Sequence, residues 1–321
     1  MASLIYGPIK IPNQRADSGL AICQYNSTIF VAYTFNGIVY VANSPDNGAD
    51  WSEPAIVANG AIPNSTPGLA AYENMLWVMY PNQADVTLYY ARSLNGFNWS
   101  IPLSMGPSYI CTRGCFLLAQ TGYTALYLAF RDGNRQLQFG KYTADSGWSV
   151  TPLPFGTGKG VPTLAGFKEM LFMVYVQDIG LYMAAYSFNT GWKPGEQISD
   201  PDDPNWGNSP WAPSLVADVG STHMTLSFWN QQSGNVSLST TPAYTWMEPH
   251  ALLPGNDSAL GTVPGDLVLC LWIRRDSFTL VGWLMEAQRK QSPRKRELLK
   301  VRKREWGSRL LCRSLMYGRL T

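Results

Sequence analysis

Five tryptophans recur at a nearly constant interval along most of the chain. They are separated by 48, 49, 44 and 54 residues, and they are Trp51, Trp99, Trp148, Trp192 and Trp246. Ahead of each tryptophan lie three short apolar or alternating stretches that are separated by turn residues, and a further short stretch follows it. A repeat of roughly 50 residues that holds four short strands is typical of a β-propeller, in which each repeat is one blade.

A sixth repeat begins at Ser258 and is incomplete. It continues through apolar stretches at 267–272 and 279–283 but offers no fourth strand. Residues 6–11 at the N-terminus resemble residues 51–56, which form the fourth strand of the first repeat. We therefore predict an all-β fold, a six-bladed β-propeller of four-stranded antiparallel blades, in which the N-terminal strand closes the last blade. Such closure would remove two open sheet edges.

The last 36 residues differ from the rest in charge. Residues 286–321 hold 12 of the 24 Lys and Arg residues and 3 of the 22 Asp and Glu residues, so the remainder carries a net charge of −7. We predict a propeller over residues 1–285 and a poorly ordered basic tail over 286–321. The alternative for the tail is a nuclear-targeting or polyanion-binding segment.

The composition limits the partners and the location. No apolar run is long enough to span a bilayer, and the N-terminus lacks the apolar core of a signal peptide. We expect a cytoplasmic protein, or one exported without a classical signal peptide. Two isolated histidines and five irregularly spaced cysteines indicate no metal site and no cofactor. We expect no nucleic-acid partner for the propeller itself.

The polar turn before each tryptophan carries a motif. Residues 44–51 fit the pattern S/T-x-D-x-G-x-x-W, residues 93–99 have Asn for Asp, and 143–148 and 187–192 are shortened forms. Over residues 1–285 the chain resembles the Asp-box, or BNR-repeat, propellers, which include sialidases and sialidase-like lectins. We expect a structural role for the motif: Asp or Asn accepts hydrogen bonds from backbone amides, Gly allows positive φ, and Trp packs between blades.

Chain direction predicts which end of the propeller binds ligands. The loops between second and third strands share one end with the connectors between blades, and polar residues follow the second strands. Two tryptophans lie in the longest connector. Aromatic rings can stack on sugars while polar side chains bond to hydroxyls. The candidate ligand-binding residues are Arg131, Asp132, Gln177, Asp178, Trp206, Trp211, Asn230, Arg274 and Asp276.

The resemblance to sialidases implies a clamp of three arginines around a sugar carboxylate. The candidates for such a clamp are Arg15, Arg113, Arg131 and Arg274. The resemblance also implies a Tyr nucleophile, an assisting Glu and an Asp acid/base. The family's F/Y-R-I-P motif is absent, however, and the nearest string, 130–133, departs from it after Arg131. No convincing Glu–Tyr pair stands out from the sequence, so no catalytic residue is assigned.

These features favour a lectin-like, multivalent propeller that binds glycans or glycoconjugates through its interblade loops. The alternative is a sialidase-like glycoside hydrolase that acts on an anionic or neutral glycan. A protein-binding scaffold is a third class, for which the sequence has no positive mark. Glycan binding without turnover would separate the first class from the other two.

Overall fold

The chain divides into two compact units, residues 1–285 and residues 286–321. The computed structural model describes residues 3–4, 9–10 and 15–284, except 47, 49, 120–122, 179, 199–211, 218–222, 231–234, 242–249, 255–256, 264–266 and 275–276. Side chains are described within 15–229 and at Thr241. The predicted basic tail lies outside the described residues.

The described strands form six antiparallel sheets, which we number in chain order. The first sheet contains β3 (Ala21–Tyr25), β4 (Thr28–Phe35), β5 (Ile38–Ser44) and β6 (Ala55–Asn59). The second contains β7 (Gly68–Tyr72), β8 (Met75–Pro81), β9 (Leu88–Ser93) and β10 (Leu103–Ser104). The third contains β11 (Cys115–Leu118), β12 (Leu126–Arg131), β13 (Gln136–Thr143) and β14 (Gly147–Thr157).

The other three sheets repeat this up-and-down order. The fourth contains β15 (Thr163–Phe167), β16 (Met170–Gln177), β17 (Gly180–Ser187) and β18 (Gly191–Gln197). The fifth contains β19 (Ser214–Ala217), β20 (Met224–Asn230), β21 (Asn235–Thr241) and β22 (His250–Pro254). The sixth contains β23 (Asp257–Val263), β24 (Leu267–Arg274) and β25 (Ser277–Leu284), together with β1 (Ser3–Leu4) and β2 (Ile9–Lys10).

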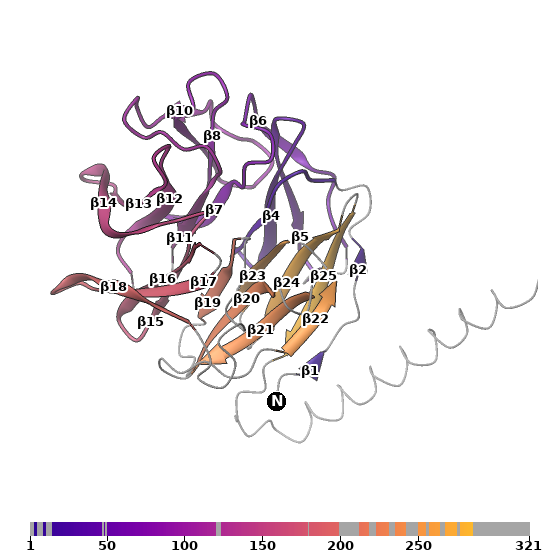
Figure 1. The fold of residues 1–321 in the computed structure, drawn as a ribbon. Coiled ribbons are helices and arrows are strands. Elements are labelled where there is room, and N and C mark those ends of the chain that lie inside the picture. Colours follow the sequence, from indigo (N-terminus) through magenta and orange to yellow (C-terminus); the bar gives the residue numbers. More distant parts are fainter. Residues whose placement is uncertain are drawn as a thin grey trace, which may run out of the picture. The chain divides into compact units, whose positions relative to one another are not determined.

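The sheets follow one another around a common axis (Figure 1). The first strand of each sheet contacts the first strand of the next, in the order β3, β7, β11, β15, β19 and β23, and β23 contacts β3 again. Cyclic contact of this kind is the arrangement of a β-propeller, in which each sheet covers one face of its neighbour. The predicted all-β propeller is therefore confirmed.

The N-terminal strands pair with the last sheet. Ser3 and Leu4 of β1 lie opposite Leu284 and Trp283 of β25, and Ile9 of β2 lies opposite Leu280 of the same strand. The predicted closure is thus confirmed, although two short strands, rather than one continuous strand, contribute to it. The free edge of β25 is covered by main-chain pairing, and an exposed strand edge would otherwise invite association with other chains.

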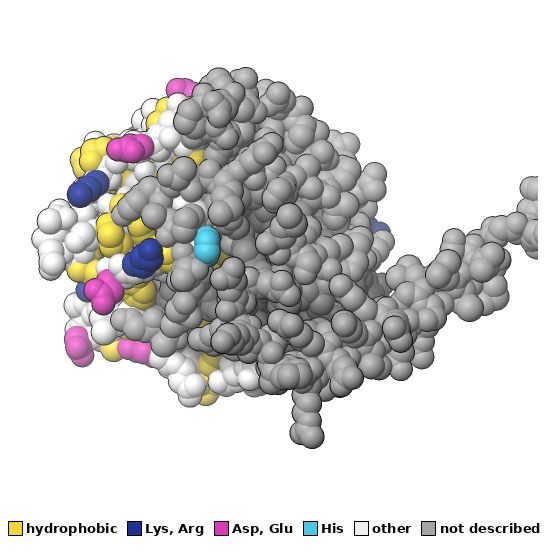
Figure 2. Space-filling model, turned by 90° about the horizontal axis from the view of Figure 1, so that it is seen from below, with side chains coloured by type: hydrophobic (Ala, Val, Ile, Leu, Met, Phe, Trp, Pro, Cys, Tyr) yellow, Lys and Arg dark blue, Asp and Glu magenta, His cyan; other side chains and the backbone are white. Residues whose placement is uncertain are grey.

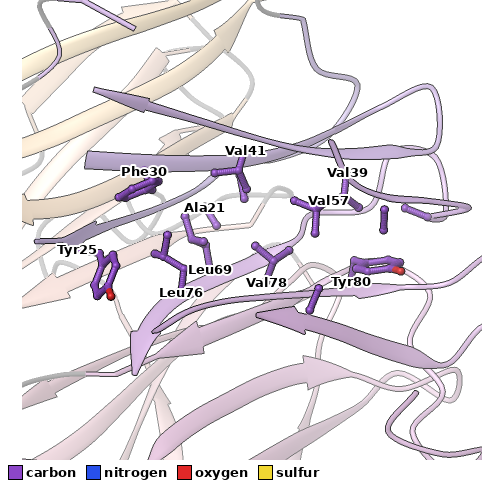
Figure 3. Close-up of a cluster of buried hydrophobic side chains, with 14 residues drawn as sticks. Ala21, Tyr25, Phe30, Val39, Val41, Val57, Leu69, Leu76, Val78 and Tyr80 are labelled. Atoms are coloured by element: carbon purple, nitrogen blue, oxygen red, sulfur yellow. The ribbon is translucent and has the colours of Figure 1, made fainter. Parts of the chain in front are cut away.

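Apolar side chains fill the space between neighbouring sheets. Figure 3 shows the contact of the first two sheets, where Val39 and Val41 of β5 face Val78 and Tyr80 of β8. These side chains are at most 1% exposed. Strands such as β8, β12 and β16 are buried along almost their whole length, because both faces of an inner strand meet a neighbouring sheet. Their nearly continuous apolar sequence follows from this position.

In the first sheet, the turn before Trp51 forms the hydrogen bonds that the motif predicts. The Ser44 hydroxyl accepts from the Gly48 amide at 2.7 Å, and the Asp46 carboxylate accepts from the Asp50 amide at 2.9 Å. The Trp51 indole N–H donates to the Gly48 carbonyl at 3.2 Å. Gly48 has a φ of +93°, which a glycine adopts without strain. The motif therefore closes a tight turn and orients the tryptophan.

The same bonds recur in the second sheet with Asn in place of Asp. Ser93 accepts from the Gly96 amide at 2.8 Å, and Asn95 accepts from the Asn98 amide at 2.9 Å. The Trp99 indole donates to the Gly96 carbonyl at 3.1 Å. In the third sheet, Trp148 packs across the sheet junction at 6.5 Å from the ring of Trp77, which belongs to the second sheet. The predicted structural role is thus confirmed for the turns of the first two sheets, whereas the buried indole N–H groups of Trp148 and Trp192 in the shortened turns have no hydrogen-bond partner.

Candidate functional site

The connectors between sheets meet the loops between second and third strands at one end of the propeller. At the junction of the first two sheets, the Gln83 amide donates to the Gly60 carbonyl at 2.7 Å. At the junction of the third and fourth sheets, the Gly158 amide donates to the Arg135 carbonyl at 3.0 Å, and the Lys159 amide donates to the Val176 carbonyl at 2.9 Å. We call this end of the propeller the connector rim.

Arg131 stands at the end of β12, where the third sheet reaches the connector rim. Its side chain is only 9% exposed. Its Nη1 donates to the Gly158 carbonyl at 3.0 Å and to the Lys159 carbonyl at 3.1 Å, while its buried Nε has no partner. The guanidinium therefore fastens the connector to the third sheet and leaves one buried donor unsatisfied.

Asp132 organises the loop that follows Arg131. One carboxylate oxygen accepts from the amides of Asn134 and Gln136, each at 2.9 Å. The other oxygen accepts from the Gln138 side-chain amide at 2.9 Å. Both oxygens are thus engaged within the loop, and the predicted ligand-binding residue Asp132 holds the shape of the rim.

Two further arginines surround Arg131. Arg113 precedes β11, Arg135 lies in the β12–β13 loop, and both side chains are exposed. Burial is the main cause that lowers the pKa of Arg131, and the neighbouring charges of Arg113 and Arg135 lower it further. Of the predicted clamp, the structure thus brings Arg113 and Arg131 together. Arg135 is a third member that the sequence interpretation did not include.

The other predicted site residues are placed as follows. Gln177 ends β16 and is half-buried, and Asp178 is exposed in the β16–β17 turn with a φ of +56°. Asp tolerates this left-handed conformation better than most residues, so Asp178 suits the turn. Arg15 is exposed just ahead of the first sheet.

The structure describes the remaining predicted site residues only in part. The backbones of Asn230 and Arg274 pair with Asn235 and Ser277, while their side chains lie outside the described residues. Trp206, Trp211 and Asp276 lie outside them altogether. No described contact therefore joins these five residues to the arginines of the third sheet.

Three Glu–Tyr pairs in the described residues were missed in the sequence: Tyr33 with Glu53, Tyr72 with Glu73 and Tyr123 with Glu169. Tyr33 of β4 is 3% exposed, and its ring stacks on Tyr40 with 5.5 Å between ring centroids. Burial, and then the charges of Tyr40 and Glu53, raise the pKa of Tyr33 above its ordinary value. A tyrosine nucleophile needs a base that eases its deprotonation, so the raised pKa and the burial oppose this chemistry. Pairing between the strands of the first sheet brings Glu53 near Tyr33.

Metal and membrane features were searched within the described part of the chain. It contains no group of three or more His, Cys, Asp or Glu side chains that could hold a metal ion. It also forms no helix with the length and apolar character needed to cross a membrane. The face in Figure 2 mixes basic, acidic and apolar side chains among its described residues, without a patch of one charge.

Comparison with known proteins shows which solved propellers have a similar fold. No protein-family model and no curated protein matches the sequence. A Hadza microbial sialidase is similar in structure with a TM-score of 0.61, at 15% identity over 87% of this chain and 68% of that one. The fold is that of a β-propeller, and sialidases are among the proteins that share it. Trypanosoma rangeli sialidase has a TM-score of 0.62 at 13% identity, covering 94% of this chain and 62% of its own.

The solved propellers of similar fold include lectins as well as sialidases. The Aleuria aurantia lectin, described as a six-bladed β-propeller with a novel mode of fucose recognition, has a TM-score of 0.61. It is 12% identical over 84% of this chain and 93% of the lectin. At such low identities the likeness concerns the fold alone. Enzymes and lectins share it, so the choice between catalysis and binding depends on the site.

Proposed function

We propose that the protein is a lectin-like propeller that binds glycans through its connector rim. In this proposal the six sheets are the six blades, and the turns before the tryptophans are Asp-box repeats. Residues 1–285 form the binding domain, and 286–321 are an appended basic segment. Trp206, Trp211, Asn230, Arg274 and Asp276 remain candidate ligand-binding residues on the later sheets.

The rim of the third sheet carries the proposal. It presents Arg113, Asn134, Arg135 and Gln136 with exposed side chains, next to the half-buried Asp132. Guanidinium and amide groups donate to sugar hydroxyls, and amide oxygens accept from them. The hydrogen bonds of Arg131 and Asp132 hold these groups in place. A rigid rim with exposed polar groups loses little entropy when a sugar binds.

Binding is favoured over hydrolysis by the state of the tyrosines. In the part of the chain that the structure describes, three tyrosines have a glutamate nearby, namely Tyr33, Tyr72 and Tyr123, and burial is the main cause that raises the pKa of each. Tyr72 and Tyr123 lie beside loops between first and second strands, at the end opposite the connector rim. Asp132, the acidic residue next to Arg131, has both oxygens occupied by the loop. Neither Asp132 nor the buried Tyr33 is available as a nucleophile or as a proton donor to a sugar bound at the rim.

The rims of the other sheets support multivalent but unequal binding. The first sheet offers the turn Asn36–Gly37, and the fourth offers Asp178, each in a short turn with positive φ. Weak sites on one rigid ring increase the apparent affinity for a multivalent glycan even when each site binds poorly. We therefore expect stronger binding to glycan-coated surfaces than to single sugars.

Glycan-array binding, followed by titration of the best glycan, tests the proposal. We expect retention on the array, with no release of fluorophore from fluorogenic glycosides. The variant Asn134→Ala should weaken binding to the best glycan, because it removes an exposed side-chain amide of the third rim, whereas the neighbouring Gln136 amide already donates to the Leu153 carbonyl at 3.0 Å. The matched control Asn189→Ala changes an exposed asparagine in a turn before a tryptophan, and it should leave binding unchanged.

Two results would contradict the proposal. Turnover of a glycoside would favour the sialidase-like hydrolase. A complete lack of glycan binding, with the fold intact by circular dichroism, would favour the scaffold. Equal loss of binding in Asn134→Ala and in Asn189→Ala would move the binding surface away from the connector rim.

A further inference from the structure

Exposed apolar side chains are concentrated in one stretch of the second sheet. Among the described residues, seven large apolar side chains are exposed, and five of them fall within residues 94–110. Single exposed apolar residues are common on protein surfaces, whereas several together commonly mark a site of interaction. We give the name apolar edge to the four that lie in the turn before Trp99 and in the segment that follows it, namely Leu94 (68% exposed), Phe97 (54%), Ile101 (85%) and Leu103 (47%).

The apolar edge lies on the outside of the ring. β10 is the outermost strand of the second sheet, whose strand order is β10-β9-β8-β7, and it is only two residues long (Figure 1). An outer strand can associate with another chain, and proteins usually guard such strands with charged residues or prolines. The outer strand β18 contains Lys193 and Glu196, and the outer strand β14 contains Pro152 and Pro154. β10 contains no residue of either kind.

The stretch around the apolar edge carries no charge. Residues 93–112 contain no Asp, Glu, Lys or Arg. Arg92, which precedes this stretch, places its guanidinium over the ring of the buried Trp77, at 5.1 Å from the ring centroid. A charged partner or an anionic membrane would be matched by side chains of the opposite charge. An uncharged apolar surface instead complements a second copy of itself, because the same surface on two chains can meet without like-charge repulsion.

The size of the apolar edge fits a weak dimer. At roughly 200 Å² for a fully exposed residue, the four side chains expose on the order of 500 Å². Two copies would together bury about 1,000 Å², which is near the lower limit for a specific interface. The shortness of β10 and Pro102 directly before it limit main-chain pairing between copies. Each edge is occupied by the other, so the association closes after two chains.

We propose that the apolar edge is a self-association surface through which two copies of this chain form a weak two-fold dimer. Its exposed turn and outer strand face the same elements of the second copy, and the apolar side chains of both leave water together. The inference goes beyond glycan binding and does not depend on it. A dimer would carry two connector rims, and additional rims would raise the avidity for a glycan-coated surface.

Sedimentation of the full-length protein over a concentration series tests the dimer. We expect the average mass to rise from one chain toward two between about 1 µM and 100 µM. High salt should not reduce this rise, because salt screens charges and not apolar contacts. Leu94→Glu/Ile101→Glu should stay monomeric with an unchanged melting temperature, because both side chains are exposed. The matched control Ile56→Glu/Phe188→Glu places the same charges on exposed apolar residues of the first and fourth sheets, and it should keep the dimer.

A charge-exchange experiment tests whether two apolar edges face each other. Leu94→Lys/Ile101→Lys should be monomeric alone, and it should form a heterodimer with Leu94→Glu/Ile101→Glu at low salt, because opposite charges then meet across the interface. Sedimentation of the mixture, with one variant fluorescently labelled, measures it. Failure of the mixture to associate would overturn the two-fold arrangement.

Three other results would overturn the self-association surface. The first is a wild-type protein that is monomeric at every concentration. The second is an equal loss of dimer in Ile56→Glu/Phe188→Glu and in Leu94→Glu/Ile101→Glu. The third is a monomer that binds phosphatidylcholine vesicles through the apolar edge, which would assign this surface to lipid. Each of these outcomes is independent of what a glycan array shows.

Discussion

The two ends of the propeller use polar residues in different ways. At the turn end, Ser44, Asp46 and Gly48 in the first sheet have direct counterparts in Ser93, Asn95 and Gly96 in the second, with the same set of hydrogen bonds. At the connector rim, each described sheet has its own loop. The loop after the second strand contains Asp132 and Arg135 in the third sheet, whereas the corresponding turn of the first sheet is the uncharged Asn36–Gly37.

The difference shows how a repeat protein separates stability from recognition. A motif that recurs in the turns of the first four sheets answers a need that those sheets share, namely a tight turn and a tryptophan placed against the neighbouring sheet. A loop that differs from sheet to sheet is free of that need. Loops on a rigid scaffold commonly carry binding residues. The comparison therefore predicts that substitutions at the turn end change stability, whereas exposed substitutions at the rim change ligand binding.

The largest effect is expected from a glycine of the turn end. In Gly96→Ala, the added methyl would collide with the ring of Phe30 in the first sheet, at a φ of +79°. Backbone strain and overpacking together should lower the free energy of unfolding by about 3 kcal/mol. Urea denaturation of the full-length protein measures it.

Gly147→Ala is the matched control for this change. Gly147 occupies the same motif position in the third sheet with a φ of +67°, but nothing lies within 4 Å of its added Cβ. Only the conformational cost remains, which is about 1 kcal/mol. Equal losses in the two variants would show that the glycine serves backbone conformation alone and not the contact between sheets.

Arg131 tests whether the rim also contains a structural residue. In Arg131→Met, both hydrogen bonds to the connector carbonyls are lost, and we expect about 2 kcal/mol of destabilisation. The exposed Arg135→Ala should change stability by less than about 0.5 kcal/mol. If Arg135→Ala destabilised the protein as much, the exposed arginines would be part of the scaffold, and the contrast between the two ends would fail.

A smaller effect is expected from the carboxylate of the turn. Asp46→Ala removes the acceptor of the Asp50 amide and should lower the free energy of unfolding by about 1 kcal/mol. Asp145, its counterpart in the third sheet, lies in the shortened motif and is exposed. Asp145→Ala should stay within about 0.5 kcal/mol of the wild type, as measured by thermal denaturation. A reversed order would mean that the shortened turn depends on its carboxylate more than the full one does.

The smallest effect concerns pH and the rim of the second sheet. Asp85 is exposed, and the little burial that it has acts to raise its pKa, but hydrogen bonds from Thr87 and Tyr89 outweigh this and lower the pKa below its ordinary value. A depressed carboxyl pKa in the folded state adds stability above the unfolded value, and this stability is lost as the pH falls through the folded value.

Asp85→Asn should therefore cost less than about 1 kcal/mol at pH 7 and almost nothing at pH 2. Urea midpoints at the two pH values measure the difference. A cost that persists unchanged at pH 2 would assign the stabilisation to the shape of the side chain and not to its charge.

The fold could be predicted because its signals are local and repeated. The tryptophan interval, the alternation of the strands and the turn motif all lie within stretches of about 50 residues, and the closure was visible because residues 6–11 resemble residues 51–56. These features depend on the residues of each repeat, and a repeat buries its two faces only against the repeats next to it.

The site was harder to predict because it depends on contacts between distant segments. The sequence indicated polar residues after each second strand, but not that Asp132 and Asp178 serve their own loops. Arg135 lies in the loop after Arg131, and its carbonyl accepts from the Gly158 amide of the next connector. This contact depends on how the connector folds back onto the third sheet, which the sequence does not show. The approach of Glu53 to Tyr33 depends on the pairing of β5 with β6, which contains an irregularity between Val39 and Tyr40.

The closure of the sixth sheet has a consequence for how the chain folds. Ser3 pairs with Leu284, so the ring can close only after almost the whole domain has been synthesised. Pairing across about 280 residues carries a large loop-closure entropy and slows folding. Until that moment β1 and β2 have no partner strand, and a nascent chain would need to be kept apart from its neighbours on the polysome.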